Sequence, residues 1–387
     1  MFKISTFNKI SPVGLDLFEE NKYTVEADNL EDAQGMVLRS HKLHDTNFPQ
    51  SLKAIARAGA GVNNIPIEKC TEEGIVVFNT PGANANGVME LTLLSLLLSS
   101  RKVTEGIEWA QTLEGDVSKK VEKGKSQFKG PEIKGKKLGV IGLGAIGVLV
   151  ANTGIKLGMD VIGYDPYISV EKAIGLSWDV EYAKSLEYLL KNSDYITLHI
   201  PLMDKTKNFI DKKEIKKMKP TARVINMSRG GLINEDALLK ALKEDRIAKY
   251  VTDFPNDKII NSKNVVGLPH LGASTYESEE NCAKMAVIEL KEYLEEGKIT
   301  NSVNYPECHL ERTEGTERIT VFNKNVTHMI SSLSSVLAQN DINIIEMVNK
   351  SKGDFAYNVV DVKGNITEDI IKELNDIEGI IKVRHII

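Results

Sequence analysis

The sequence is poor in cysteine and has no excess of basic residues. Its 387 residues include only three cysteines, Cys70, Cys282 and Cys308. These are odd in number and far apart, so they indicate neither a disulfide framework nor a CxxC metal site. The 49 Lys and Arg side chains against 54 Asp and Glu give a net charge of −5, which does not predict the basic surface of a nucleic-acid-binding protein. We therefore expect a cytoplasmic protein in a reducing setting, with no metal and no nucleic-acid partner.

Long hydrophobic runs are also missing. The most apolar region, 88–98, is interrupted by Glu90, Thr92 and Ser95 and is too short to cross a bilayer. The first six residues lack the apolar core of a signal peptide. Hydrophobic residues make up 42% and charged residues 27% of the chain, as in ordinary globular proteins. At about 150 residues per domain, the length predicts two to three domains. The missing apolar run predicts no membrane contact.

Short β-branched runs alternate with helical stretches, which predicts α/β layers built on parallel sheets. A first series covers 24–78, and an apolar helix over 86–102 follows it, as expected for a helix buried between two units. A second series begins at Lys137 and is typical of a doubly wound dinucleotide-binding domain. Its six predicted strands are 137–141, 161–164, 195–200, 222–226, 249–252 and 264–267.

The remaining third of the chain predicts a long helix and a separate small module. The helix is expected over 274–296, with Ser274 as N-cap and Glu277 completing a capping box. A polar segment containing Pro306 is predicted to be a linker. The order strand, helix, strand, strand, helix, strand then predicts a ferredoxin-like βαββαβ module. The predicted domains are 1–92 with 271–305, 93–270, the linker 306–317, and 318–387.

A GxGxxG run is formed by Gly142, Gly144 and Gly147, directly after a predicted strand and before a helical stretch. Glycines at this spacing permit a tight turn, backbone approach to a pyrophosphate and close helix–strand packing. Asp165 ends the next strand, 18 residues beyond Gly147, where an acid accepts from a ribose 2′-hydroxyl. No Arg or Lys follows it, so the pattern favours NAD over NADP. The alternative is a glycine-rich turn in an ordinary α/β core.

Polar residues that suit acid–base chemistry follow the predicted strands. His270 comes after the last strand of the second series. Arg229 comes just past another strand and is followed by two glycines, Gly230 and Gly231. Carboxyl ends of parallel strands build the active sites of such sheets, and an Arg fork binds carboxylates. Asp257 could hold a protonated His270, or it could be a solvated loop carboxylate. His199, also at a strand end, is interpreted as part of a cofactor pocket or as a structural histidine.

Four segments, 57–65, 142–147, 228–231 and 269–274, resemble the D-2-hydroxyacid dehydrogenase family in matching order. The resemblance covers residues 1 to about 305, and 318–387 resemble an ACT regulatory domain. It implies a Rossmann-type doubly wound domain inserted in a flavodoxin-like substrate domain, NAD as cofactor, and a homodimer or higher homo-oligomer. The most similar branch is the one that oxidises D-3-phosphoglycerate to 3-phosphohydroxypyruvate in the phosphorylated route to serine.

The resemblance also implies roles for individual residues. Arg229 would bind the substrate carboxylate, and His270 would be the acid/base. Asp257 replaces the family's Glu, and Lys258 replaces the Pro that follows it. Further cofactor contacts are implied for Ala145, Ile146, His199, Met227, Ser228 and Thr252, the last standing where the family often has Asp. Substrate contacts are implied for Arg39, Ser40, Gly59, Ala60, Gly61, Val62 and Asn63, with the Arg39 fork facing a phosphate.

In the ACT-like module, Asn323, Asn325 and Asn343 fall where serine-binding members place amide or imidazole side chains. Amides both donate to and accept from an amino-acid ligand, so L-serine is a possible effector. The family's Pro-Gly is replaced by Thr327-His328, and the alternative is an assembly module without a ligand. For the whole chain, the alternatives are another D-2-hydroxyacid dehydrogenase, such as a hydroxypyruvate or glyoxylate reductase, and a non-catalytic NADH-sensing protein.

Overall fold

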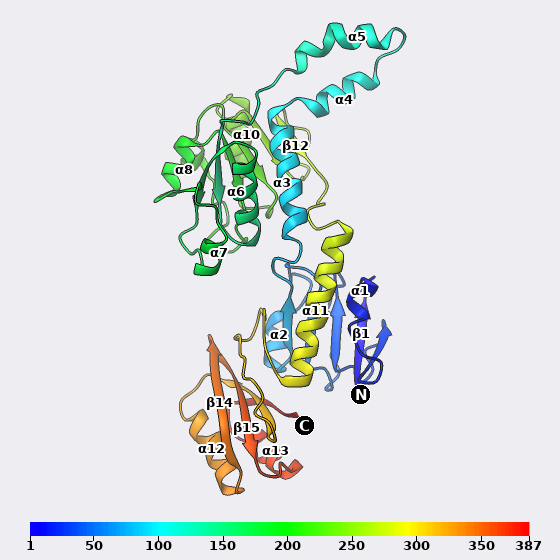
Figure 1. Ribbon diagram of the computed structural model, residues 1–387, viewed down its shortest axis with the longest axis vertical. Helices are drawn as coiled ribbons and strands as arrows, with labels where there is room; N and C mark the ends of the chain where they lie inside the picture. Colours follow the sequence, from blue (N-terminus) through cyan, green and yellow to red (C-terminus); the bar gives the residue numbers. More distant parts are fainter. Residues whose placement is uncertain (387) are drawn as a thin grey trace. The chain divides into compact units, whose positions relative to one another are not determined.

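A computed structural model describes residues 1–386 and divides the chain into two units. The first unit combines Met1–Ala83 with Glu279–Ile387, and the second is Asn84–Ser278. The chain therefore leaves its first unit once and returns to it (Figure 1). In the part of the chain that the structure describes, no helix is long and apolar enough to cross a membrane.

The N-terminal part of the first unit is a five-stranded parallel sheet with the order β2-β1-β3-β4-β5. This order is flavodoxin-like and confirms the predicted fold. The strand β1 was not predicted from the sequence, because its polar Ser5 and Thr6 are buried inside the unit. The strands are β1 (Phe2–Phe7), β2 (Tyr23–Ala27), β3 (Gly35–Leu38), β4 (Ala54–Arg57) and β5 (Val76–Asn79), with short helices α1 (Pro12–Leu15) and α2 (Ile67–Glu72).

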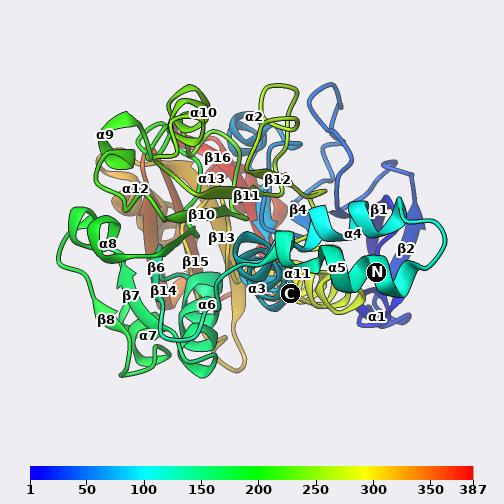
Figure 2. The same cartoon turned by 90° about the horizontal axis from the view of Figure 1, so that it is seen from above.

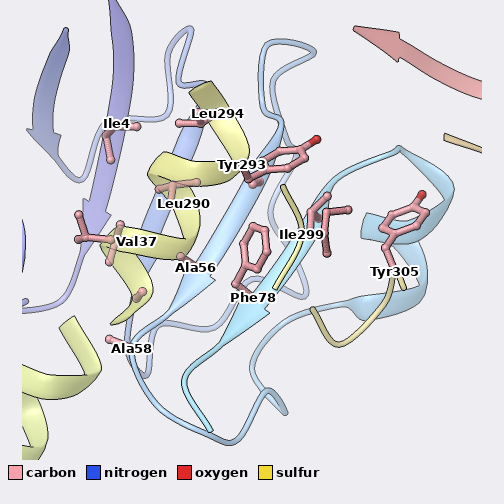
Figure 3. Close-up of a cluster of buried hydrophobic side chains, with 14 of the residues drawn as sticks. Ile4, Val37, Ala56, Ala58, Phe78, Leu290, Tyr293, Leu294, Ile299 and Tyr305 are labelled. Carbon is pink, nitrogen blue, oxygen red and sulfur yellow. The ribbon is translucent and has the colours of Figure 1, made fainter. Parts of the chain in front are cut away.

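The long helix α11 (Tyr276–Glu296) begins at the end of the second unit and continues in the first. Figure 3 shows Leu290, Tyr293 and Leu294 of α11 lying over the five-stranded sheet, where they join one buried cluster with Ile4 and Phe78. Burial of such large side chains contributes about 1.5–3 kcal/mol each. The apolar face of α11 therefore provides much of this unit's core.

The predicted cap of α11 was wrong by one residue. The helix begins at Tyr276, and the hydroxyl of Thr275 accepts a hydrogen bond from the Ser278 backbone N–H at 3.0 Å. Thr275 thus satisfies a first-turn amide in the way an N-cap does. The expected capping box of Ser274 and Glu277 does not fit this start.

The second unit is a seven-stranded parallel sheet with the order β12-β11-β10-β9-β6-β7-β8. From β8 to β11 this is the doubly wound order of a Rossmann fold, with β12 added at one edge, and the order reverses between β6 and β9. The short edge strand β8 was not predicted. The strands are β6 (Lys137–Ile141), β7 (Asp160–Tyr164), β8 (Glu181–Tyr182), β9 (Tyr195–Leu198), β10 (Arg223–Asn226), β11 (Lys249–Thr252) and β12 (Val265–Gly267).

Helices cover both faces of this sheet (Figure 1, Figure 2). Buried residues of α3 and α6 share one apolar cluster with the sheet, and those of α8, α9 and α10 share another. The helices are α3 (Ala85–Ser100), α4 (Val103–Gln111), α5 (Val117–Gly124), α6 (Ala145–Lys156), α7 (Val170–Ile174), α8 (Leu186–Asn192), α9 (Lys212–Ile215) and α10 (Glu235–Lys243), with a 3₁₀ turn η1 (Lys125–Phe128).

The C-terminal module is a four-stranded antiparallel sheet with the order β14-β15-β13-β16. Its element order confirms the predicted ferredoxin-like βαββαβ topology. Both helices pack on one face of this sheet, and Phe322 and Tyr357 on the other face join the core shared with α11. The elements are β13 (Glu317–Lys324), α12 (Met329–Gln339), β14 (Asn343–Lys352), β15 (Phe355–Lys363), α13 (Glu368–Asn375) and β16 (Ile380–Ile386).

The segment 306–317, predicted as a linker, is packed rather than loose. Cys308 and Leu310 are buried, and the Cys308 backbone exchanges hydrogen bonds with Ile299. Next to it, the guanidinium of Arg318 forms a fully buried, two-pronged ion pair with Asp361, at 2.6 and 2.9 Å. The Arg318 guanidinium also donates to the Glu296 carbonyl of α11 at 3.0 Å, which ties the C-terminal module to the rest of the first unit.

Candidate active site

The glycine run forms the turn between β6 and α6, at the point where the strand order reverses. Gly142 has φ +90°, and a side chain on it would lie 2.5 Å from the His199 carbonyl oxygen. A Cβ on Gly147 would meet the Gly142 carbonyl oxygen at 1.9 Å, whereas nothing lies within 4 Å of the corresponding position at Gly144. Two glycines therefore permit the turn itself, and the third leaves the backbone open to a ligand.

The start of α6 suits an anion. Its N-cap is Gly144, which provides no side-chain cap, so the first-turn amides, including those of Ala145 and Ile146, lack that partner. Unpaired amides and the positive end of the helix dipole favour phosphate groups. The open space at Gly144 and this uncapped helix start both fit the pyrophosphate of a dinucleotide.

Asp165 lies directly after β7 and is bound to the glycine turn. Its Oδ2 accepts from the Leu143 backbone N–H at 2.9 Å, and its Oδ1 accepts from that of Tyr167 at 2.9 Å. Two backbone donors hold the carboxylate at the edge of the turn. This arrangement fits an acceptor for ribose hydroxyls.

His199 follows β9, and its backbone carbonyl lies close to Gly142 of the glycine turn. Burial lowers the pKa of its imidazole to about 3, so the ring is neutral. Its Nε2 is 3.0 Å from the Thr197 hydroxyl, and its Nδ1 has no hydrogen-bond partner among the described residues. A ring that burial keeps neutral suits a structural role, and the predicted cofactor contact stays a prediction.

Arg229 lies on the loop after β10, which is held by a residue that the sequence did not single out. The Asn226 side chain donates to the Arg229 carbonyl at 2.9 Å and accepts from the Ser228 backbone N–H at 3.1 Å. The Arg229 guanidinium donates to the Ser228 carbonyl at 2.7 Å. Met227 is buried, while Ser228 and Arg229 are half-buried, so the loop presents the Arg fork and one hydroxyl from a fixed backbone.

Thr252, the last residue of β11, and Asp253, which follows it, differ in the hydrogen bonds of their side chains. Thr252 is fully buried, and its hydroxyl donates to the Asn226 carbonyl at 3.0 Å and accepts from the Phe254 N–H at 3.1 Å. These bonds favour a structural role for Thr252. Asp253, which the sequence reasoning missed, is 1% exposed. Burial raises its pKa to about 6, against the lowering effect of nearby Arg229.

His270 lies on the loop after β12, with its ring 4.6 Å from that of Phe254. Phe254 in turn approaches the Arg229 loop, because a Cβ on Gly230 would lie 3.6 Å from the Phe254 Cβ. Phe254 therefore lies close to both the loop that bears Arg229 and the loop that bears His270. Asp257 lies further along the loop after β11 and is exposed, and its pairing with His270 stays a prediction.

The predicted substrate residues of the first unit follow β3 and β4, at the carboxyl edge of the five-stranded sheet. Arg39 pairs with Glu279 of α11 at 2.6 Å, and both side chains are partly exposed. The side chain of Asn8 accepts from the backbone amides of Ser40 and His41 at 2.9 and 2.7 Å. The loop that carries Arg39 is therefore fixed, and its guanidinium is held by a partner that a phosphate could displace.

The loop after β4 contains a glycine in a backbone conformation that residues with a side chain rarely adopt. Gly59 has φ +144°, and a Cβ there would lie 1.8 Å from Nη1 of Arg57. The Ala60 carbonyl accepts from the Asn79 side chain at 2.7 Å, and the Asn63 carbonyl lies 2.9 Å from Nε2 of His44. Gly61 and Val62 are half-buried between them. The structure thus places all seven predicted substrate residues on two neighbouring loops of one sheet edge.

The C-terminal module contains a cavity of about 260 Å³ that includes two of the three predicted regulatory residues. Asn323 and Asn325 line it, but Asn343 does not, because it begins β14 away from this end of the strand. Asn349, further along β14, lines the cavity in its place, together with His328. Strand register decides this difference, and the sequence alone does not give it.

Among residues 1–386, no group of three or more His, Cys, Asp or Glu side chains could hold a metal ion.

Comparisons with known proteins agree with this arrangement. Residues 93–272 match the NAD binding domain of D-isomer specific 2-hydroxyacid dehydrogenases. The chain is 30% identical to the D-3-phosphoglycerate dehydrogenase of Haemophilus influenzae, over 98% of this chain and 94% of that protein. It is 38% identical to the enzyme of that name from Methanocaldococcus jannaschii, over 74% of this chain and 54% of that protein. The chain thus spans about half the length of several curated relatives that it matches.

A solved structure shows the same relationship. NAD⁺-bound 3-phosphoglycerate dehydrogenase of Entamoeba histolytica is 28% identical and covers 78% of this chain and 98% of its own, with a TM-score of 0.62. The match of the NAD binding domain and the near full-length similarity to the Haemophilus protein settle the family. The chain belongs to the D-isomer specific 2-hydroxyacid dehydrogenases, and its residues 93–272 form their NAD-binding domain.

Proposed function

We propose that the protein oxidises the C2 hydroxyl of D-3-phosphoglycerate to 3-phosphohydroxypyruvate. The observation that carries this proposal is the position of Arg229 and His270 at the carboxyl edge of an NAD-binding sheet. The two residues lie on loops that both approach Phe254. The near full-length similarity to a protein named D-3-phosphoglycerate dehydrogenase supports this substrate. The reaction is the first step of phosphorylated serine synthesis.

The chemistry follows from the two side chains. Arg229 binds the substrate carboxylate through its guanidinium fork and fixes the orientation of C2. His270 takes the proton of the C2 hydroxyl as that carbon becomes a carbonyl. NAD⁺, when bound, accepts the hydride. Because oxidation releases a proton, the yield of ketone rises with pH.

Arg39 supplies the preference for a phosphorylated substrate. Its guanidinium suits a phosphate dianion, and its present partner, Glu279, is a partly exposed carboxylate. Surface ion pairs contribute at most about 1 kcal/mol, so a dianion displaces Glu279 at little cost. Ser40, beside it, and the loop from Gly59 to Asn63 complete the proposed substrate contacts.

The test follows the absorbance of NADH during reduction of 3-phosphohydroxypyruvate, with hydroxypyruvate and glyoxylate measured in parallel. Rapid turnover that prefers the phosphorylated ketone supports the proposal. Preference for either unphosphorylated ketone identifies another 2-hydroxyacid dehydrogenase instead. NADH binding with no turnover of any of the three identifies a non-catalytic sensor.

Two variant pairs assign the roles. His270→Ala is expected to lose most turnover and still bind NADH, whereas His309→Ala, at an exposed histidine of the segment 306–317, keeps both. Arg39→Ala is expected to raise KM for the phosphorylated ketone far more than for hydroxypyruvate, whereas Arg246→Ala, at a surface arginine, changes neither. Equal KM changes with both ketones would remove the phosphate role of Arg39.

We propose that the C-terminal module is an ACT-type regulatory domain that binds an amino acid such as L-serine. Its cavity combines the amides of Asn323, Asn325 and Asn349, which can bind ammonium and carboxylate groups together. Millimolar L-serine is expected to slow NADH oxidation, and Asn349→Ala is expected to abolish the effect. Turnover that serine leaves unchanged would instead favour an assembly role for the module.

We propose a homodimer formed through α4, α5 and η1. These helices contain no buried residue, and Val103, Ile107 and Val117 are 44%, 54% and 45% exposed. Figure 1 shows the α4–α5 pair extending beyond the end of α3. Light scattering is expected to show a dimer that Ile107→Glu dissociates, while Val170→Glu, on exposed α7, leaves it intact. A monomeric wild-type protein would contradict this proposal.

We place the protein in the cytoplasm because its three cysteines are all free and buried, as expected in a reducing compartment. Fractionation of cells that produce the native protein tests this location.

A further inference from the structure

A buried carboxylate lies among the ends of the three strands that carry the proposed chemistry. Asp253 directly follows β11, which pairs in parallel with β10 on one side and β12 on the other. Thr252, the residue before it, is in register with Asn226 and Gly267. Asp253 is therefore flanked by the loop that bears Arg229 and by the loop that bears His270.

The Asp253 carboxylate is enclosed and only partly satisfied. The residue is 1% exposed, and its Oδ1 is buried without a hydrogen-bond partner among the described residues. Its Oδ2 lies toward the His270 loop, because a Cβ on Gly272 would be 3.6 Å from this oxygen. A buried acceptor left without a donor costs about 1–3 kcal/mol, and more when charged, so a site of this kind calls for a partner supplied in another state.

The charge beside Asp253 comes from Arg229, which acts to lower the carboxyl pKa while burial raises it to about 6. The Arg229 guanidinium donates to Ser228 within its own loop, and a guanidinium has five N–H groups in a planar fork. One edge of the fork can hold a substrate carboxylate while another N–H reaches a protein acceptor. Asp257, by contrast, is exposed, where a carboxylate contributes at most about 1 kcal/mol to an ion pair.

On the basis of the proposed function, we propose that Asp253 is the positioning residue of Arg229: its unpartnered Oδ1 accepts from the guanidinium when a 2-oxo or 2-hydroxy carboxylate is bound. Asp253 thereby orients the fork that holds the substrate and does not touch the reacting atoms. Asp257 was predicted to hold His270, so the role proposed here for Asp253 toward Arg229 is a separate one.

The first experiment measures binding of oxamate, a 2-oxo carboxylate that is not reduced, to the NADH-loaded protein through NADH fluorescence. Asp253→Asn keeps the shape of the side chain and removes its charge, and Asp160→Asn, at the exposed start of β7, is the matched control. The expected result is a Kd for oxamate at least tenfold higher in Asp253→Asn and within twofold of wild type in Asp160→Asn. NADH affinity stays within twofold in both variants, which shows that they fold.

The second measurement needs only the wild-type protein and follows Kd for oxamate between pH 5 and pH 8. Protonation of Asp253 removes the counter-charge, so Kd is expected to rise as pH falls through about 6. The other charged or titratable groups near Asp253 are Arg229 and Tyr250, with Glu235 close to Tyr250 and His270 on the next loop. A protonated histidine would attract oxamate and lower Kd, which is the opposite change.

The outcomes separate this inference from the proposed function. Wild-type turnover with an unchanged oxamate Kd in Asp253→Asn overturns the role of Asp253 and leaves the enzyme standing. An equal loss of affinity in Asp160→Asn also overturns it. A wild-type protein that neither turns over a ketone nor binds oxamate overturns both.

Discussion

Glu289 offers a stability prediction with a defined dependence on pH. This residue of α11 is 4% exposed inside the first unit. Its Oε1 accepts from the Asn301 amide at 2.7 Å, and its Oε2 is buried without a partner among the described residues. Burial raises the carboxyl pKa from 4.5 to about 8, so the folded protein holds Glu289 protonated near neutrality.

The sign and size of the effect follow from this rise. A carboxyl that binds its proton more tightly in the folded state stabilises the fold fully below its unfolded pKa, and this stability is lost as pH rises toward the folded value. At about 1.4 kcal/mol per pKa unit, and with both ends of the interval close to a pKa value, the loss between pH 5 and pH 8 is about 3.5 kcal/mol. For a unit of this size, each 1 kcal/mol corresponds to roughly 2–4 °C in Tm, which gives roughly 7–14 °C.

The assay compares wild type with Glu289→Gln by calorimetry at a series of pH values. Gln has the shape of the protonated carboxyl and does not titrate, so the two proteins are expected to have similar Tm values at pH 5. The variant should become more stable by roughly 7–14 °C at pH 8. Parallel curves would refute the reasoning, because every other group titrates in both proteins.

Three further predictions concern the ion pairs and the glycine turn. Arg318→Met leaves the carboxylate of its buried ion pair uncompensated and is expected to lower the free energy of unfolding by about 3–5 kcal/mol, measured by chemical denaturation; an unchanged midpoint would contradict it. Glu279→Gln releases Arg39 and is expected to lower KM for the phosphorylated ketone about two- to fivefold, with no change for hydroxypyruvate; a shared decrease would disprove the phosphate role. Gly147→Ala places a methyl group against a carbonyl oxygen at 1.9 Å, so fluorescence titration should show NADH affinity reduced more than tenfold, and wild-type affinity would be the contrary result.

Sequence reasoning worked where one residue type meets a local backbone requirement. The glycine run, its strand and its helix lie where the pattern predicts, because only glycine fits the positive φ of Gly142 and the close approach at Gly147. The ferredoxin-like order and the doubly wound sheet of the second unit were also predictable from the alternation of apolar runs, whereas the flavodoxin-like sheet was implied by the family resemblance. The first strand was not, since buried polar residues hide it.

Side-chain surroundings were less predictable than backbone. Asp253 and Asp257 are the same residue type on one loop, four positions apart, yet one is buried and the other exposed. Spacing along the chain favoured Asp257, because it matches the family's acidic position. Only the packing of β11 between two other strands shows that the enclosed carboxylate is at 253.

The cavity of the C-terminal module shows how a residue outside a site can fix the residues within it. The Asn349 amide donates to Asn358 at 2.6 Å, and that of Asn358 donates to Asn323 at 2.7 Å, across three neighbouring strands. Asn349 and Asn323 line the cavity, whereas Asn358 is fully buried between them. Because an amide has both a donor and an acceptor end, the bonds of Asn358 determine which end each neighbour has left for a ligand. The polarity of the cavity therefore depends on the register of β15 with β13 and β14, which no single segment of the sequence contains.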